Sequence, residues 1–184
     1  PKNKVVGMAG ILDSSRFIYF LSQELNVPVV KIKSFVLGGH GDSMVAMLGS
    51  TEVEGKKITD LINERKLSKE KLDQIIDRTK KGGAEIVKYL EKGSAFYAPA
   101  ASGVEMAECY LKDQKKQLPC AVYLNGEYGT KDIYAGVPVI IGSQGVEKIV
   151  ELKLTADEMA NFRKSVQAVK ELFDAAKKID TELK

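Results

Sequence analysis

The chain has 184 residues, of which 44% are hydrophobic and 29% charged, a composition typical of a globular domain with one good core or two small ones. Its formal net charge of +3 comes from 28 basic and 25 acidic residues spread along the chain, without the dense basic stripe and interleaved aromatic residues of a nucleic-acid-binding protein. No apolar run is long enough to cross a bilayer, and two cysteines with a single histidine argue against a zinc site or a disulfide framework.

The first third of the chain is expected to contain a strand, a helix and an antiparallel hairpin. The apolar run over residues 5–12 predicts a strand, and residues 13–26 predict a helix because their apolar positions recur at helical spacing. Residues 29–37 and 44–53 predict strands on either side of a glycine-rich loop, and a turn follows at residues 54–55. Because it starts with a strand almost at once, the chain is expected to be part of a longer protein.

The middle of the chain is expected to be helical. A helical pattern begins at Ser68 and is interrupted at Gly82-Gly83, which should kink or split the helix. Another helix is expected after Pro99. Its buried side should carry four apolar or small residues, Val104, Met106, Ala107 and Leu111.

Strands return in the last third, before a final helix. Residues 121–124 and 135–141 predict two strands, and residues 149–152 predict a last short one. Thr155 and Glu158 have the spacing of a capping box, which predicts the start of a long C-terminal helix. The order of these elements predicts an α+β fold, with antiparallel or mixed sheets packed with helices.

The only histidine, His40, lies in the run Gly38-Gly39-His40-Gly41, where small neighbours let the backbone approach a ligand. Imidazole is the side chain whose ordinary pKa permits proton exchange near neutral pH. Any acid–base step that a histidine performs in this chain must therefore use His40. The alternative is a histidine that is only hydrogen-bonded within a turn, and the residues alone leave both readings open.

Asp13 and Arg16 are a second pair of candidate residues. They stand three residues apart at the start of the expected helix, so their side chains project from neighbouring parts of one face. A pair at this spacing is most often a surface ion pair that stabilises little. From spacing alone, a mutual salt bridge is the preferred interpretation.

With these segments the chain resembles the malate and lactate dehydrogenases, which reduce 2-oxo acids with a nicotinamide cofactor. The resemblance rests on residues 7–17, GMAGILDSSRF, and residues 38–43, GGHGDS, in the family's order and separation. It covers nearly all of residues 1–184 as the family's C-terminal, substrate-binding and catalytic domain. The N-terminal dinucleotide-binding domain is expected to be absent from this chain, because no G-x-G-x-x-G motif lies between a strand and a helix.

The resemblance implies a role for each candidate residue. His40 is implied to donate and accept the proton at the substrate oxygen, and Asp13 to accept a hydrogen bond from the other ring nitrogen and so orient the ring. Arg16 is implied to bind the substrate carboxylate through two parallel N–H donors. Pro99 is implied to lie beside the nicotinamide, although a proline at this place is equally a helix-start signal. No metal is expected.

Within the family the sequence is more similar to bacterial malate dehydrogenases than to the lactate enzymes. The Gly-Met-Ala-Gly form of residues 7–10 and Ala95, where lactate enzymes usually have a threonine, both favour malate. The expected function is that of the catalytic domain of an NAD-dependent enzyme of the tricarboxylic acid cycle, which interconverts (S)-malate and oxaloacetate in the cytoplasm. The isolated chain is expected to be inactive, because NAD would be bound mainly by the absent domain.

Two alternatives stay open. One is the same domain of an L-lactate dehydrogenase. The other is a non-catalytic domain of the same ancestry that serves oligomerisation or binds small anions, and the intact set of Asp13, Arg16 and His40 argues against it. The expected partners are a small dicarboxylate substrate and further copies of the chain, in a dimer or a tetramer, with no nucleic acid and no membrane.

Overall fold

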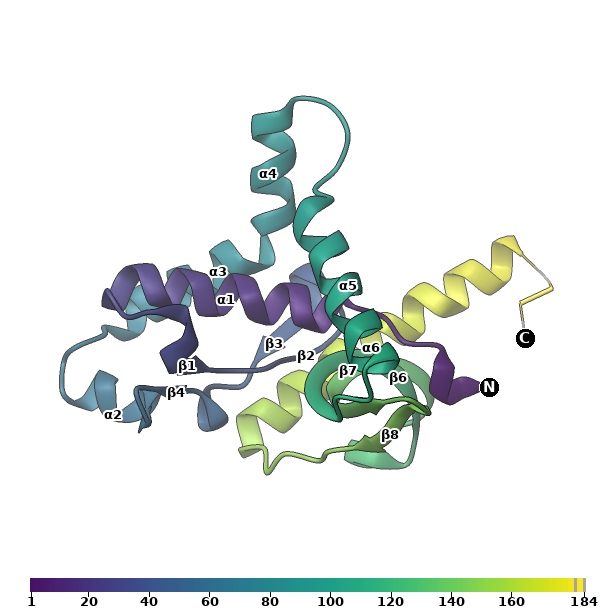
Figure 1. The fold of residues 1–184 in the computed structure, drawn as a ribbon. Helices are drawn as coiled ribbons and strands as arrows, with labels where there is room; N and C mark the ends of the chain where they lie inside the picture. Colours follow the sequence, from purple (N-terminus) through teal and green to yellow (C-terminus); the bar gives the residue numbers. More distant parts are fainter. Residues whose placement is uncertain (181, 184) are drawn as a thin grey trace.

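A computed structural model describes residues 1–180, 182 and 183 of the chain. They form two antiparallel sheets packed with helices, and helix α1 (Ala9–Leu25) crosses the middle of the molecule (Figure 1). The expected α+β class is therefore confirmed. None of the helices in these residues has both the length and the apolar character that a membrane span needs.

The larger sheet has five strands in the order β3-β2-β7-β6, with β8 paired to β7, and all its pairings are antiparallel. Its bounds are β2 (Val36–Gly38), β3 (Met44–Ala46), β6 (Lys116–Asn125), β7 (Lys131–Gly142) and β8 (Gly145–Ile149). The strands expected over residues 121–124 and 135–141 are confirmed as parts of β6 and β7. The strand expected over residues 149–152 is wrong in position, because the tight turn between Gly142 and Gly145 lets β8 pair with β7 at once.

The smaller sheet has the order β1-β4-β5, with β1 (Ile32–Lys33), β4 (Glu52–Val53) and β5 (Lys56–Lys57). The expected strands over residues 29–37 and 44–53 are thus each divided between the two sheets. Strands of both sheets contribute to one core, through Ile32 and Val53 of the smaller sheet and Val36 and Met44 of the larger, while Leu37 of β2 packs in the other core. The turn expected at residues 54–55 is confirmed, with Gly55 at a φ of 80°.

The strand expected over residues 5–12 is wrong, because α1 begins at Ala9 rather than at Asp13. Only Gly7 makes a strand-like pairing, with Ala121 of β6. The amides of Ile11 and Leu12 donate to the carbonyl of Met8 instead, which turns the apolar run into the first turn of a helix. A short apolar run fits a buried strand or a buried helix equally well.

The helices after the smaller sheet are α2 (Ile58–Asn63), α3 (Lys69–Lys80), α4 (Gly82–Leu90) and α5 (Tyr97–Leu111). The expected break at Gly82-Gly83 is confirmed as the junction of α3 and α4. In Figure 1, α4 and the start of α5 rise away from the sheets. The expected apolar side of α5 is confirmed only at Met106, which packs against the core of the larger sheet, whereas Val104, Ala107 and Leu111 are exposed. The residues that α5 buries are Ser102 and Cys109.

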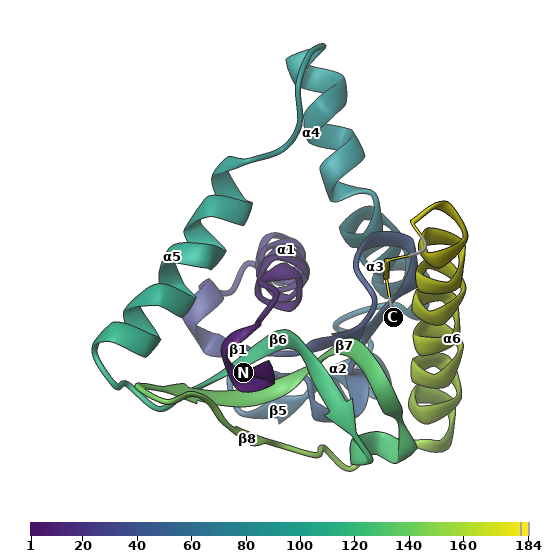
Figure 2. The ribbon, with the colours of Figure 1, turned by 90° about the vertical axis from the view of Figure 1, so that its right-hand side faces the viewer.

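The C-terminal helix α6 (Ala156–Ile179) begins with the expected capping box. The amide of Glu158 donates to Thr155 Oγ1 at 3.2 Å, and the amide of Thr155 donates to Glu158 Oε2 at 2.8 Å. Phe162 and Val166 then pack into the core beneath the larger sheet. Figure 2 shows α6 along one side of the molecule and α1 end-on, between α5 and α3.

Helix α1 joins the two hydrophobic cores. Ile11 belongs to the core that β6, β7 and α6 also line, whereas Phe17 and Leu21 belong to the core lined by α3 and the smaller sheet. Phe17 and Leu21 are both 0% exposed, and burial of side chains of this size stabilises a fold by roughly 1.5–3 kcal/mol each. The turn of α1 between these anchors, which carries Asp13 and Arg16, is therefore held on both sides.

Candidate active site

Asp13 is placed by close packing of α1 on β6. A Cβ at Gly10 would lie 2.5 Å from the carbonyl oxygen of Pro119, so only glycine permits this approach. One turn later, Asp13 is 1% exposed. Burying a carboxylate costs free energy unless a partner is supplied, so its neighbours matter.

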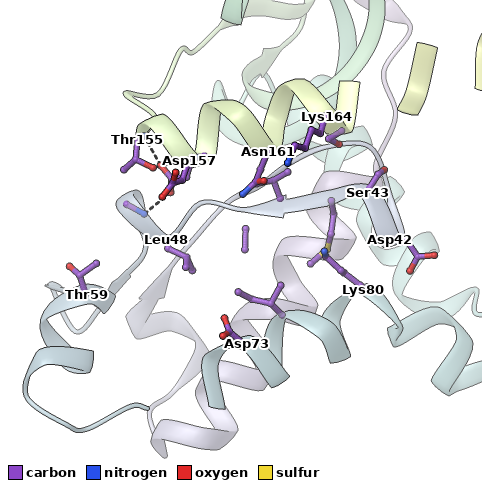
Figure 3. A pocket seen from close by; sticks show the side chains of 17 residues that line it. Asp42, Ser43, Leu48, Thr59, Asp73, Lys80, Thr155, Asp157, Asn161 and Lys164 are labelled. Atoms are coloured by element: carbon purple, nitrogen blue, oxygen red, sulfur yellow. Dashed lines mark hydrogen bonds between the residues drawn. The ribbon is translucent and has the colours of Figure 1, made fainter. Parts of the chain in front are cut away.

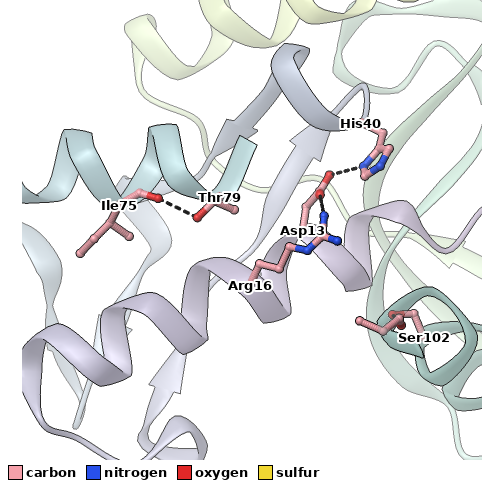
Figure 4. Close-up of polar contacts among 7 residues, drawn as sticks. Asp13, Arg16, His40, Ile75, Thr79 and Ser102 are labelled. Atoms are coloured by element: carbon pink, nitrogen blue, oxygen red, sulfur yellow. Dashed lines mark hydrogen bonds and ion pairs between the residues drawn. The ribbon is translucent and has the colours of Figure 1, made fainter. Parts of the chain in front are cut away.

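His40 lies in the loop that follows β2. The strand itself is tied to α1, because the amide of Val36 donates to Ser14 Oγ at 2.9 Å. Gly38 and Gly41 have φ angles of 87° and 68°, which favour glycine on both sides of the histidine. The loop therefore returns toward α1 and carries the imidazole to Asp13 (Figure 4).

The central contact of the site joins Nδ1 of His40 to Oδ2 of Asp13 at 2.9 Å. This hydrogen bond raises the pKa of His40 above its ordinary value; partial burial of the ring and the charge of Arg16 oppose it, and the charge of Asp13 adds to it. With Nδ1 directed at the carboxylate, Nε2 lies on the opposite side of the ring. The side chain is 53% exposed, so another molecule can reach it.

Arg16 lies on the same side of α1, one turn after Asp13. Its Nη1 is 4.0 Å from Asp13 Oδ1, and its side chain is only 11% exposed. The hydrogen bonds found among the described residues include none from its guanidinium, and Oδ1 of Asp13 is buried without a hydrogen-bond partner there. The mutual salt bridge that spacing alone favoured is therefore present only as a loose ion pair without a hydrogen bond, and the guanidinium keeps its donors for a ligand.

The junction of α3 and α4 forms the other wall around Arg16. A Cβ at Gly82 would lie 3.0 Å from Cδ and 3.2 Å from Nε of Arg16, so this position leaves room for the guanidinium. The sequence pattern predicted only a helix break at Gly82 and did not indicate this contact. The pair of consecutive glycines was the available signal, since glycine also permits close approach.

Pro99 occupies the third position of α5 and is partly exposed. A proline in the first turn of a helix removes an N–H that has no helical acceptor. The contacts described for Asp13, Arg16 and His40 do not include Pro99. Its suggested place beside a nicotinamide therefore stays a prediction.

A large groove of about 610 Å³ lies next to the His40 loop, between β3, α3 and α6 (Figure 3). Its walls carry acidic residues such as Asp73 and Asp157 together with the bases Lys80 and Lys164. It contains no histidine, and four acidic residues line it against two lysines. In the described part of the chain there is also no cluster of three side chains able to hold a metal ion. The candidate active site is therefore formed by Asp13, Arg16 and His40. It combines a proton-exchanging imidazole, a carboxylate that holds it, and a neighbouring guanidinium.

Comparison with known proteins gives a single family. The family model for the lactate/malate dehydrogenase alpha/beta C-terminal domain matches residues 11–179. The chain is 65% identical to a malate dehydrogenase of Pelagibacter ubique over 183 residues, which is 100% of this chain and 57% of that protein. The chain thus spans little more than half the length of this relative.

Solved structures agree with that assignment of fold. A malate dehydrogenase of Cryptosporidium parvum superposes with a TM-score of 0.93 at 44% identity, over 97% of this chain and 57% of the other. A lactate dehydrogenase of the same organism, complexed with lactic acid and nicotinamide adenine dinucleotide, gives a TM-score of 0.91 at 43% identity, over 93% of this chain and 54% of the other.

Proposed function

The chain belongs to the lactate/malate dehydrogenase family, as its α/β C-terminal domain, and from this premise we propose that it is the substrate-binding and catalytic domain of an NAD-dependent malate dehydrogenase. The reaction is the interconversion of (S)-malate and oxaloacetate. The observation that carries the proposal is the 2.9 Å contact between Asp13 and His40, with a partly buried guanidinium beside it.

In this mechanism His40 exchanges a proton with the substrate oxygen. Its Nδ1–H donates to Asp13, so Nε2 is the nitrogen that faces the substrate. The imidazolium donates the Nε2 proton to the oxygen of oxaloacetate during reduction, and neutral Nε2 takes the proton back during malate oxidation. Asp13 favours the imidazolium and fixes the orientation of the ring.

Arg16 binds the substrate carboxylate. A guanidinium presents parallel N–H donors that match the two oxygens of a carboxylate. The nearest acid, Asp13, is 4.0 Å away and directs its other oxygen at His40, so Arg16 is available to the substrate. Its low exposure strengthens the interaction, since a partly buried charge pair is screened less by water and salt.

The nicotinamide cofactor, when bound, supplies or accepts the hydride. Dinucleotides bind at parallel sheets with a glycine-rich turn, and the sheets of the described residues are antiparallel. These residues therefore offer at most one side of the cofactor site, with Pro99 as the candidate contact. We propose that NAD is bound mainly by an N-terminal domain outside this sequence and that the isolated chain is inactive.

Malate is favoured over lactate by one comparison. The relative with 65% identity is a malate dehydrogenase, whereas the solved malate and lactate enzymes of Cryptosporidium parvum, at 44% and 43% identity, do not separate the two. Ala95 points the same way, because it lacks a hydroxyl that the lactate enzymes usually have. The proposed setting is a cytoplasmic homo-oligomer that acts in the tricarboxylic acid cycle on a small dicarboxylate, without a nucleic-acid or membrane partner.

The test is activity of the full-length polypeptide that carries this domain. With NADH as reductant, oxaloacetate reduction should exceed pyruvate reduction in kcat/KM. A preference for pyruvate would identify a lactate dehydrogenase instead. Absence of both activities in a folded protein would favour the non-catalytic reading, in which the domain serves assembly or binds small anions.

A further inference from the structure

The loop that carries His40 is held from a second side, by α6. The amide of Gly39, the residue before His40, donates to Oγ of Ser165 at 2.8 Å. Ser165 is 3% exposed and lies 126 residues further along the chain. A partly buried hydrogen bond of this kind helps to fix a backbone position, because breaking it leaves an amide that water reaches poorly without an acceptor.

The same helix also holds the far end of the hairpin that contains the loop. Two turns before Ser165, Oε1 of Glu158 accepts from the amide of Gly49 at 2.7 Å. Strand β3 lies between the two contacts, so α6 is fixed against the segments before and after it. The loop therefore cannot shift along α6 without breaking one of these bonds.

Close packing leaves little freedom at the loop itself. A Cβ at Gly38 would overlap the hydroxyl of Ser165 and lie 2.9 Å from its Cβ. A Cβ at Gly39 would lie 3.1 Å from Cγ2 of Val169, one turn further along α6. Because Gly38 and Gly39 have no side chains, the backbone of the loop can lie directly against side chains of α6. Ser165 is the polar side chain of α6 at this contact.

We propose that Ser165 is a positioning residue for His40, an inference that rests on the proposed function. The imidazole side chain is 53% exposed, so packing alone constrains it weakly. Two hydrogen bonds therefore set its place: the ring donates to Asp13, and the amide of Gly39 donates to Ser165. The hydrogen bond of Ser165 goes to the backbone rather than to the ring, so Ser165 acts by holding the backbone from which the ring extends.

Ser165→Ala in the full-length enzyme tests the inference. The loop loses its acceptor, so kcat for oxaloacetate reduction should fall about 10- to 100-fold, the usual effect of misplacing a reacting group by about 1 Å. KM for oxaloacetate should change little, because Arg16 lies on α1. A looser ring also weakens the bond to Asp13, so the decline of kcat/KM with rising pH should move to lower pH; Asp13 and Arg16 are the charged groups that act on His40.

Ser34→Ala is the matched control. Ser34 is 6% exposed, and its hydroxyl bonds to that of Thr51 at 2.7 Å, away from the His40 loop. It should lower the melting temperature without a shift in the pH profile. If Ser165→Ala does the same and keeps the wild-type kcat and pH profile, Ser165 is only structural and the inference fails.

Two further experimental outcomes also test the inference. If Ser165→Ala does not fold, Ser165→Cys replaces the hydroxyl acceptor by a thiol sulfur, which accepts only weakly and so holds the amide of Gly39 poorly. A folded Cys variant with wild-type kcat overturns the inference, and one with a reduced kcat and the pH shift supports it. If the wild-type enzyme itself reduces no 2-oxo acid, the proposed function fails first, and the positioning role fails with it.

Discussion

The buried carboxylate of Asp13 reaches His40 with one oxygen only. Oδ2 lies 2.9 Å from Nδ1 of the imidazole, whereas Oδ1 has no hydrogen-bond partner among the described residues. The whole stabilisation of this buried carboxylate by a hydrogen bond therefore comes from the imidazole. A substitution of either residue should therefore affect the side chain of the other.

Replacing His40 by asparagine should lower kcat for oxaloacetate reduction by a factor of roughly 10² to 10⁴, the usual contribution of a general acid–base group. Asparagine retains a polar side chain but has no proton to exchange near neutral pH. The side chain is half exposed, so the fold should survive, as circular dichroism can verify. Near-normal turnover in the variant would remove His40 from the mechanism.

Asp13→Asn should move the pH dependence of oxaloacetate reduction to lower pH. Asp13 raises the pKa of His40, chiefly through the hydrogen bond. Reduction uses the imidazolium, so its rate declines as the pH rises through this pKa, and a neutral amide in place of the carboxylate lowers the pKa and hence the midpoint. The profile of kcat/KM against pH measures the shift. An unmoved midpoint would show that Asp13 does not control the protonation of His40.

Arg16→Lys should raise KM for oxaloacetate by about one to two decades. Lysine keeps the charge but loses the pair of parallel donors, and one charge-assisted hydrogen bond contributes roughly 1.5–3 kcal/mol, where about 1.4 kcal/mol is tenfold. The affinity for NADH should not change. Arg163→Lys, an exposed arginine of α6, is the control and should leave both constants alone. An unaltered KM in Arg16→Lys would return Arg16 to the structural ion pair with Asp13.

Local signals predicted well those elements whose stabilising contacts are close in sequence. The capping box of Thr155 and Glu158 and the break at Gly82 need only residues a few positions apart, and both are confirmed. The trio of Asp13, Arg16 and His40 was found through family motifs, because 27 residues separate the carboxylate from the imidazole and no periodicity connects them.

The predictions that failed, and the contacts that were not predicted, depend on residues far apart in the sequence. The run over residues 5–12 was assigned to a strand because only packing on β6 decides that it becomes a helix from Ala9 onward. The hydrogen bond from Gly39 to Ser165 spans 126 residues, and no local sequence pattern at either residue predicts it. Val104 and Leu111 of α5 are exposed although Met106 packs on the core, so an apolar pattern by itself did not identify the buried side.

Two helical glycines should respond in opposite ways to alanine in this 184-residue chain. At Gly10 a Cβ would lie 2.5 Å from the carbonyl oxygen of Pro119, a backbone atom that cannot turn aside, whereas at Gly103 of α5 it would meet nothing within 4 Å among the described residues. Gly10→Ala should therefore destabilise the fold by about 3 kcal/mol through overpacking, and Gly103→Ala should stabilise it by about 0.5–1 kcal/mol through helix propensity. Chemical denaturation of the two variants beside the wild type measures both differences.

Gly10→Ala also tests whether the packing of α1 on β6 positions the residues of the candidate active site. Forcing α1 away from β6 displaces Asp13 and Arg16, which follow Gly10 by three and six residues on the same helix. In the full-length enzyme, Gly10→Ala should accordingly lower kcat as well as stability, while Gly103→Ala should leave kcat unchanged. If Gly10→Ala were as stable and as active as the wild type, the close approach of α1 to Pro119 would not be what places the carboxylate against His40.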